Sequence, residues 1–178
     1  TEALAEAADP TSNIVLVPAF TGLGAPHWKP EARAALFNMT RDSGKAEIVR
    51  AALEAVSLQT DDLLRAINDD MAHAGLSVPP RLRVDGGMVA NDWFVQNLAD
   101  LCGCPIDRPE VIETTAAGAA MLAMVKLGWY DSAADFAVGW HLDAAFEPSM
   151  PEDRRAQKQS VWRAALEPIL RGSEPPGN

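Results

Sequence analysis

Positive charge is scarce in this chain. Its 178 residues include 15 lysines and arginines against 25 aspartates and glutamates, so the formal net charge is −10 at pH 7. An acidic chain lacks the basic surface with which proteins follow nucleic-acid phosphates or anionic lipid headgroups. The charge balance therefore argues against nucleic-acid binding and against a role on anionic membrane surfaces.

Long apolar runs are absent as well. No window approaches the roughly 18–20 consecutive apolar residues that a membrane-spanning helix needs. The first residues, Thr1–Pro10, carry acids and no basic segment of the kind that opens a secretory signal. We therefore expect no membrane partner. The lack of an initiating methionine suggests a piece of a longer chain.

Cysteine is nearly absent, since Cys102 and Cys104 are the only two and a single glycine separates them. That spacing is poor for a disulfide, and no second pair completes a zinc site. The three histidines, His27, His73 and His141, have no metal-binding spacing, and no GxSxG nucleophile elbow is present. We expect two buried, reduced thiols at an element end, no metal site, and a cytoplasmic location.

What the chain does have is a globular composition, with 48% hydrophobic and 22% charged residues. This suffices for a core without disulfide bonds. The β-branched run at Asn13–Val17 predicts a buried strand, and Arg33–Thr40 predicts a second strand antiparallel to it. The segment Phe20–Pro30 is rich in glycine and proline, which predicts a rigid loop packed by Phe20 and Trp28, or the lining of a cleft.

Helical spacing begins after Ser43-Gly44. From Ala46 to about Asn68 the apolar residues recur every three or four positions without glycine or proline, which predicts a long amphipathic helix. Further elements are expected at Arg81–Asp85 (strand), Asn91–Leu101 (helix), Pro105–Pro109 (extended), Thr114–Leu127 (helix ended by Gly128), Ala133–Val138 (short helix), His141–Pro148 (strand or ordered loop) and Pro151–Leu170 (helix). Strands that alternate with helices indicate an α/β fold. We expect one domain over residues 1–171 and a flexible tail over residues 172–178.

The segment Val84–Asp92 is the best candidate for a ligand-binding loop. A strand runs into Gly86-Gly87 and then into a helix. Two glycines let a ligand approach the backbone, and free N–H groups at a helix start favour a phosphate or another polar ligand. Asn91 is either the N-cap or a first-turn residue, so its amide could cap the helix or reach the ligand. A tight turn with a capping asparagine is the alternative, because the segment is neither GxGxxG nor a P-loop.

Other candidate residues have simpler interpretations. Gly118, within an alanine-rich helix, favours close helix packing, although it could also border a flat ring such as adenine. The acid pairs Asp61-Asp62 and Asp69-Asp70 are expected on a solvated helix face. Asp85 could act as a base or a magnesium ligand, or could stabilise the turn. The residues alone give no nucleophile with a base and no phosphate-binding lysine.

Four blocks of the sequence resemble consecutive blocks of the FGGY family of carbohydrate kinases; they lie at residues 17–41, 48–64, 82–109 and 114–123. The resemblance extends from about Asn13 to Trp162 and is that of the carboxyl-terminal lobe. Within the family, Pro18–Trp28 is similar to the members that phosphorylate glycerol. Sister sugar kinases usually carry an arginine in this loop, whereas this chain has Leu23.

The resemblance implies a ribonuclease H-like (actin-like ATPase) fold, a mixed sheet flanked by helices with a β-β-β-α-β-α-β-α core. It implies that the intact enzyme uses Mg²⁺ and ATP to phosphorylate glycerol, giving ADP and sn-glycerol 3-phosphate. The family's nucleotide contacts fall on Gly87 and Asn91, with Gly86 in the same turn. Asn38 stands where the family commonly has glycine, and asparagine tolerates the left-handed conformation such a turn needs.

The resemblance also implies that the phosphate loop, the polyol pocket and the general base precede this chain. The chain then carries no catalytic residue, its partner is the amino-terminal lobe of the same enzyme, and it is inactive alone. Apolar surface exposed where that lobe docks could drive assembly into a homo-oligomer. Two alternatives stay open, namely a lobe of a kinase for another sugar or polyol such as xylulose, and a non-catalytic binding or oligomerisation module.

Overall fold

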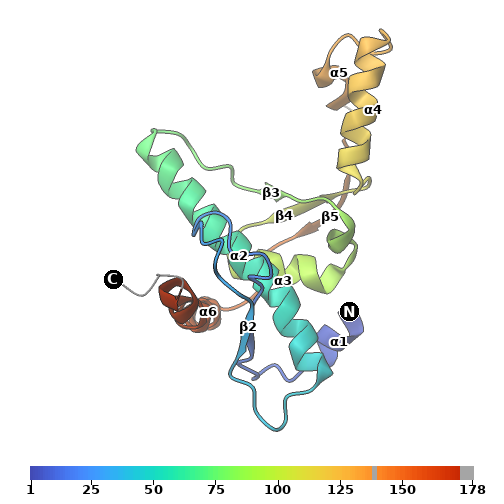
Figure 1. Ribbon diagram of the computed structural model, residues 1–178. Coiled ribbons are helices and arrows are strands. Elements are labelled where there is room, and N and C mark those ends of the chain that lie inside the picture. Colours follow the sequence, from blue (N-terminus) through green and yellow to red (C-terminus); the bar gives the residue numbers. More distant parts are fainter. Residues whose placement is uncertain (138–139, 173–178) are drawn as a thin grey trace.

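The computed structural model describes residues 1–137 and 140–172 (Figure 1). In chain order the elements are α1 (Glu2–Ala7), β1 (Val15–Val17), β2 (Ala35–Phe37), α2 (Lys45–His73), β3 (Leu82–Arg83), the 3₁₀ helix η1 (Gly87–Ala90), α3 (Asp92–Cys102), β4 (Ile106–Pro109), α4 (Thr114–Lys126), α5 (Ala133–Ala137), β5 (Leu142–Phe146) and α6 (Glu152–Gly172).

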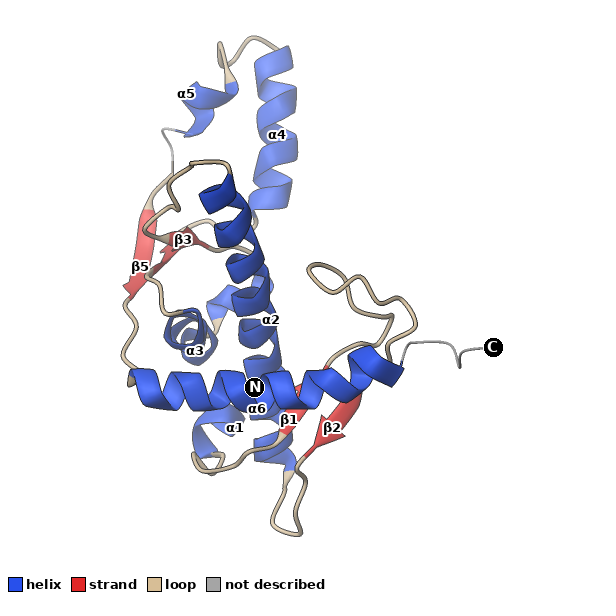
Figure 2. Ribbon diagram, turned by 90° about the vertical axis from the view of Figure 1, so that its left-hand side faces the viewer, coloured by secondary structure: helices blue, strands red, loops and turns tan. Residues whose placement is uncertain are grey.

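The strands form two separate sheets (Figure 2). β1 and β2 are antiparallel, with Val15 opposite Phe37, as expected. In the second sheet β4 is central, parallel to β3 and antiparallel to β5, so this sheet is mixed. The segment at His141–Pro148 is therefore a strand rather than a loop.

The family resemblance implies three strands before the long helix, and the structure has two. The intervening residues 18–34 include Pro18, Pro26 and Pro30 and form only isolated bridges. Proline cannot donate to a strand ladder, which accounts for the lack of a regular strand there.

The long helix α2 is the spine of the molecule (Figure 1). It begins as predicted after Gly44, whose N–H donates to the Glu47 carboxylate at 2.9 Å. It runs five residues past the expected end at Asn68 to His73, because the first breaker is Gly75, at φ +69°. Its buried residues lie between Ala51 and Asp61, and the helix packs against α1, α3 and β1, while its carboxyl-terminal end projects from the body.

Two apolar clusters flank α2 and form the core. One lies between β1, α2 and α6 around Trp162, which is 1% exposed. The other joins α1, α2, α3 and β4 around Phe94, Val95 and Ile106. Burying side chains of this size contributes about 1.5–3 kcal/mol each relative to leaving them in water. Helix α1 belongs to this core through Ala5, although the sequence analysis assigned no element there.

The loop at Phe20–Pro30 is ordered, but the two aromatic residues that were expected to pack it do not pack against the protein. Phe20 and Trp28 are 72% and 74% exposed, so that expectation is wrong. Leu23 anchors the loop instead, being buried and forming an antiparallel bridge with Lys29. Gly22, at φ +97°, lies so close to Pro30 that a Cβ would come within 2.6 Å of its Cα, which leaves room only for glycine.

Asn38 adopts the left-handed conformation expected for a residue in place of glycine, with φ +60°. Its side-chain amide donates to the carbonyl of Asn13 at 3.0 Å, which ties β2 to the segment before β1. The turn therefore survives the replacement of glycine.

Helices α4 and α5 form an arm that projects away from the rest of the chain (Figure 1). None of the residues of α4 is buried, and a Cβ on Gly118 would meet no atom within 4 Å. The expectation that Gly118 serves close helix packing is therefore wrong within the part of the chain that the structure describes. The end of α4 is as predicted, with Gly128 at φ +75°.

The last helix, α6, extends to Gly172, so the expected tail loses its first residue to the helix. The remainder of that tail, residues 173–178, and Val138 of the predicted short helix lie outside the described residues. Across the described ranges, no helix is both long and apolar enough to span a membrane.

Candidate functional site

The turn at Gly86–Asn91 departs from the simple strand-to-helix connection that the sequence suggests. Gly86 has φ +91° and ψ +168°, a conformation open essentially to glycine. The chain then makes one 3₁₀ turn, η1, before α3 begins at Asp92. A Cβ on Gly87 would meet nothing within 4 Å, so its backbone is open to a ligand.

Asn91 is the N-cap of α3, which decides between the two positions the sequence allowed. Its Oδ1 accepts a hydrogen bond from the N–H of Phe94 at 2.9 Å. Its Nδ2 lies 3.4 Å from Oγ1 of Thr1, a long and weak contact. The side chain thus caps the helix with its oxygen and keeps an amide donor at the surface.

An open pocket brings Gly87 and Asn91 together. Its other lining residues come from the start of α1, from α2 and from η1; they are Thr1, Glu2, Leu53, Met88 and Ala90. Gly86 does not line this pocket, although its conformation sets the direction of η1.

Helix α1 forms one wall of this pocket, and sequence reasoning missed it. The Glu2 carboxylate accepts from the N–H of Trp93 at 3.2 Å, which joins α1 to the first turn of α3. The only local signal was the helix-favouring composition of Glu2–Ala7, which is too short for a periodic pattern to stand out.

Asp85 lies beside the turn but is exposed, and no hydrogen bond of its carboxylate is found among the described residues. The turn is held by a different contact, the N–H of Gly86 donating to the carbonyl of Ile112 at 2.8 Å. Asp85 therefore does not stabilise this turn. Over residues 1–137 and 140–172, no three His, Cys, Asp or Glu side chains are grouped for metal binding.

The acid pair Asp61-Asp62 does not lie on a solvated face, so that expectation is wrong. Asp61 is 6% exposed and bonds to Arg65 at 2.8 Å, and its burial raises the pKa of this carboxyl. Asp62 accepts from Nε1 of Trp162 at 2.7 Å and lies 3.3 Å from Nε2 of His27. The second pair, Asp69-Asp70, is exposed as predicted.

Both thiols are free and sit at and just past the end of α3, as expected, but Cys102 and Cys104 are half-buried rather than fully buried. Burial raises the pKa of both thiols. A raised pKa keeps them protonated at neutral pH and unreactive as nucleophiles.

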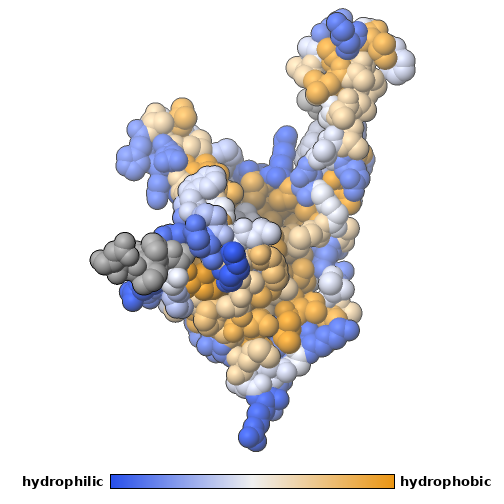
Figure 3. All heavy atoms as spheres, in the orientation of Figure 1, coloured by the Kyte–Doolittle hydropathy of each residue, from blue (hydrophilic) through white to orange (hydrophobic). Residues whose placement is uncertain are grey.

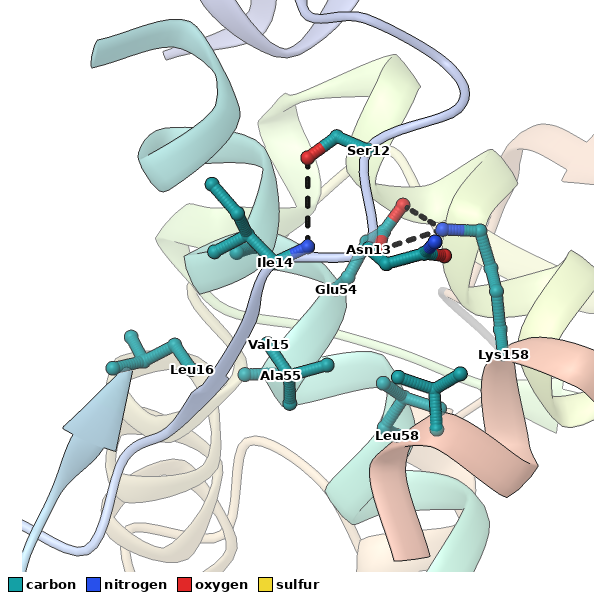
Figure 4. Close-up of a pocket in the computed structure, with 11 residues that line it drawn as sticks. Ser12, Asn13, Ile14, Val15, Leu16, Glu54, Ala55, Leu58 and Lys158 are labelled. Atoms are coloured by element: carbon teal, nitrogen blue, oxygen red, sulfur yellow. Dashed lines mark hydrogen bonds and ion pairs between the residues drawn. The ribbon is translucent and has the colours of Figure 1, made fainter. Parts of the chain in front are cut away.

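A small cavity between β1, α2 and α6 has the charged side chains of Glu54 and Lys158 in its lining (Figure 4). Nζ of Lys158 donates to both carboxylate oxygens of Glu54 at 2.8 Å, and Nε of Arg50 donates to the same carboxylate at 2.9 Å. The cavity volume of about 20 Å³ holds one water at most. This cluster therefore braces the core and offers no ligand site.

Comparison with known proteins identifies the family. Residues 1–127 match the model of the carboxyl-terminal domain of the FGGY carbohydrate kinases. The chain belongs to the FGGY family of carbohydrate kinases. This confirms the resemblance drawn from the sequence blocks, and with it the ribonuclease H-like, actin-like ATPase fold class with a mixed sheet flanked by helices.

Individual FGGY relatives are close in sequence. The chain is 52% identical over 170 residues to a glycerol kinase of Rhizobium meliloti, covering 96% of this chain and 34% of that protein. It is 53% identical over 168 residues to one of Rhizobium rhizogenes, covering 94% and 34%. The structure of Plasmodium falciparum glycerol kinase with ADP matches with a TM-score of 0.78 at 34% identity, covering 95% and 33%. The chain thus spans about one third of the length of the relatives it matches.

Proposed function

We propose that residues 1–171 are the nucleotide-binding carboxyl-terminal lobe of a glycerol kinase. The observation that carries this is the 52% identity over 170 residues to the Rhizobium meliloti glycerol kinase. The intact enzyme transfers the γ-phosphoryl group of ATP to glycerol with Mg²⁺ and yields ADP and sn-glycerol 3-phosphate. It acts in the cytoplasm.

In this proposal Gly86, Gly87 and Asn91 form the nucleotide contact. The glycines leave the backbone of the turn bare, which suits the close approach of a flat base or a ribose. The Nδ2 group of Asn91 holds only a 3.4 Å contact with Thr1, so it can exchange that contact for a stronger bond to the nucleotide. The ADP bound to the Plasmodium falciparum relative supports a nucleotide as the ligand class.

The chemistry falls to the other lobe. Phosphoryl transfer depends on positioning the two substrates and on stabilising the charge that develops between them. In the described part of this chain, no group of three acidic, histidine or cysteine side chains is available for Mg²⁺. The ion is then held by the nucleotide phosphates and by the amino-terminal lobe, which also supplies the glycerol pocket and the general base. This chain carries no catalytic residue and is inactive alone.

The surface supports a docking partner of this kind. Helix α4 has no buried residue, and Leu122, Leu127 and Trp129 of the arm are 66%, 68% and 71% exposed. Figure 3 shows hydrophobic residues along the arm and over the body beneath it. Large apolar side chains exposed together in this way mark an interaction site. The amino-terminal part of the same enzyme covers it, and without that part the chain self-associates.

Two measurements test the proposal. The isotopically labelled chain is titrated with Mg-ADP while its backbone amide NMR shifts are recorded, and we expect saturable shifts centred on Gly86, Gly87 and Asn91. The full-length protein is assayed with ATP and glycerol, and we expect phosphorylation that the 178-residue chain lacks. Absence of ATP-dependent phosphorylation in the full-length protein would overturn the proposal.

Another sugar or polyol could replace glycerol as the phosphoryl acceptor, because in this proposal the acceptor pocket lies outside this chain. The Leu23 loop and the glycerol kinase relatives favour glycerol. An assay of the full-length protein with glycerol, xylulose and erythritol separates these acceptors. A protein that binds nucleotide and phosphorylates none of them would favour the third candidate, a non-catalytic module of the same fold.

A further inference from the structure

Arg108 links the central strand of the mixed sheet to the candidate nucleotide turn. It lies on β4, and its side chain is 13% exposed. Its Nη1 donates to the carbonyl oxygen of Val89 in η1 at 2.8 Å and to Oδ1 of Asp92, the first residue of α3, at 2.6 Å. Its Nε donates to Oδ2 of Asp143 on β5 at 2.7 Å.

The Arg108 guanidinium is held in place by residues of β5 as well as by its contacts with the turn. It lies over the ring of Phe146, with 5.3 Å between the guanidinium carbon and the ring centroid. A planar guanidinium held by a ring and a carboxylate presents its remaining donors in a set direction. The hydrogen bonds from Arg108 therefore attach the Val89 carbonyl and the Asp92 carboxylate to the sheet.

The turn needs such a support. η1 is four residues long and follows two glycines, whose backbone has more freedom than that of other residues. Among the described residues, its other attachments include the hydrogen bond from Gly86 to Ile112, the burial of Val89 and the cap that Asn91 forms with the N–H of Phe94. Arg108 binds the stretch at Val89 and at Asp92, on either side of Ala90 and Asn91. Loss of its contacts therefore loosens the stretch around Asn91 at both Val89 and Asp92.

Arg81 provides a matched comparison on the same sheet. Its Nε and Nη2 donate to Asp107, the neighbour of Arg108 on β4, at 2.9 and 2.7 Å, and its Nη1 donates to Glu147 at 2.9 Å. It braces the sheet as Arg108 does, and none of these bonds reaches η1 or α3.

We propose that Arg108 is a positioning residue for nucleotide binding, which holds Gly87–Asn91 in the geometry that receives the nucleotide. The inference rests on the proposed function of that turn. Arg108 itself touches no substrate, and it acts through Val89 and Asp92.

The test compares Arg108→Met, Arg108→Lys and Arg81→Met in the full-length protein. Without Arg108 the turn must be ordered when the nucleotide binds, and an ordering cost of about 1.4 kcal/mol weakens binding tenfold. We expect Arg108→Met to raise the KM for ATP by about tenfold while the KM for glycerol stays unchanged. Arg108→Lys should recover part of this, because an ammonium group can pair with one carboxylate but cannot hold all three partners. Arg81→Met should leave the KM for ATP unchanged.

Amide hydrogen exchange supplies a readout that does not depend on activity. We expect faster exchange over residues 87–91 in Arg108→Met and not in Arg81→Met. Equal KM values for ATP in wild type and a folded Arg108→Met would overturn the inference, as would equal increases in both methionine variants. If Arg108→Met does not fold, Asp92→Ala removes the acceptor of the same link, and unchanged exchange and KM for ATP in that variant overturn the inference. A wild-type protein that neither binds nor uses ATP overturns the proposed function itself.

Discussion

Asp62 is the residue at which three distant segments meet. It projects from α2, accepts a hydrogen bond from the indole of Trp162 on α6 at 2.7 Å, and lies 3.3 Å from His27 in the loop after β1. Trp162 is 1% exposed, so its N–H has no access to water as a substitute acceptor. One carboxylate therefore holds the packing of α6 and the loop onto α2.

We expect Asp62→Ala to lower the free energy of unfolding by about 1–3 kcal/mol, the usual cost of a buried donor left without an acceptor. Equilibrium unfolding of the chain in urea measures this change. Asp69→Ala is the control, because Asp69 is exposed on the same helix and such substitutions stay within about 0.5 kcal/mol. Equal losses in the two variants would contradict a role for the Asp62–Trp162 bond.

At the scale of elements, the pairing of β3 with β4 is reinforced by an ion pair that makes stability depend on pH. Hydrogen bonds from Arg81 hold the pKa of Asp107 below its ordinary value. Because the pKa is lower in the folded state, the ionised carboxylate stabilises the fold above the unfolded-state pKa of about 3.9. This contribution is lost as the pH falls from that value toward the folded-state pKa.

We expect Asp107→Asn to flatten the fall in melting temperature below about pH 4, measured by circular dichroism. Arg81→Met should flatten the same range, because the cation that lowers the pKa of Asp107 is gone. An Asp107→Asn profile parallel to that of the wild type at all pH values would show that the pair does not contribute to acid sensitivity.

The sequence correctly predicted those elements whose formation depends on a local residue pattern. The 3.6-residue period predicted α2 and α3, and Gly86-Gly87 with Asn91 marked the turn between strand and helix. Helix α1 was missed because six residues form fewer than two turns. Asp62 was misassigned because its environment is created by Trp162, a hundred residues away, and no helical period records that contact. The same reason hid Thr1 and Glu2 in the pocket wall.

For the molecule as a whole, the arm of α4 and α5 stands out because α4 has no buried residue in the part of the chain that the structure describes. A helix in a globular protein buries one face against another element. α4 buries none within the described residues, although its sequence is rich in alanine and also contains Met121, Leu122, Met124 and Val125. From the contrast with α2 and α3, which are buried on one face, we propose that another part of the protein covers the arm.

Leu122→Glu tests this directly. In the 178-residue chain Leu122 is 66% exposed, so we expect a change below about 0.5 kcal/mol in unfolding free energy and weaker self-association in sedimentation. In the full-length protein the same charge would be buried, and its cost should be at least the roughly 1.5–3 kcal/mol of apolar burial that leucine supplies. Thermal unfolding of both forms, with and without the substitution, measures the difference.

Met39→Glu is the matched control, since Met39 is 53% exposed in the turn after β2, at the opposite end of the molecule from the arm (Figure 1). It should leave both forms unchanged. A full-length protein that tolerates Leu122→Glu as well as Met39→Glu would mean that the arm stays uncovered in the intact enzyme. The amino-terminal lobe would then dock elsewhere, and the apolar arm would serve self-association. Destabilisation confined to the full-length Leu122→Glu variant would place the missing lobe, or the segment that leads from it, against α4.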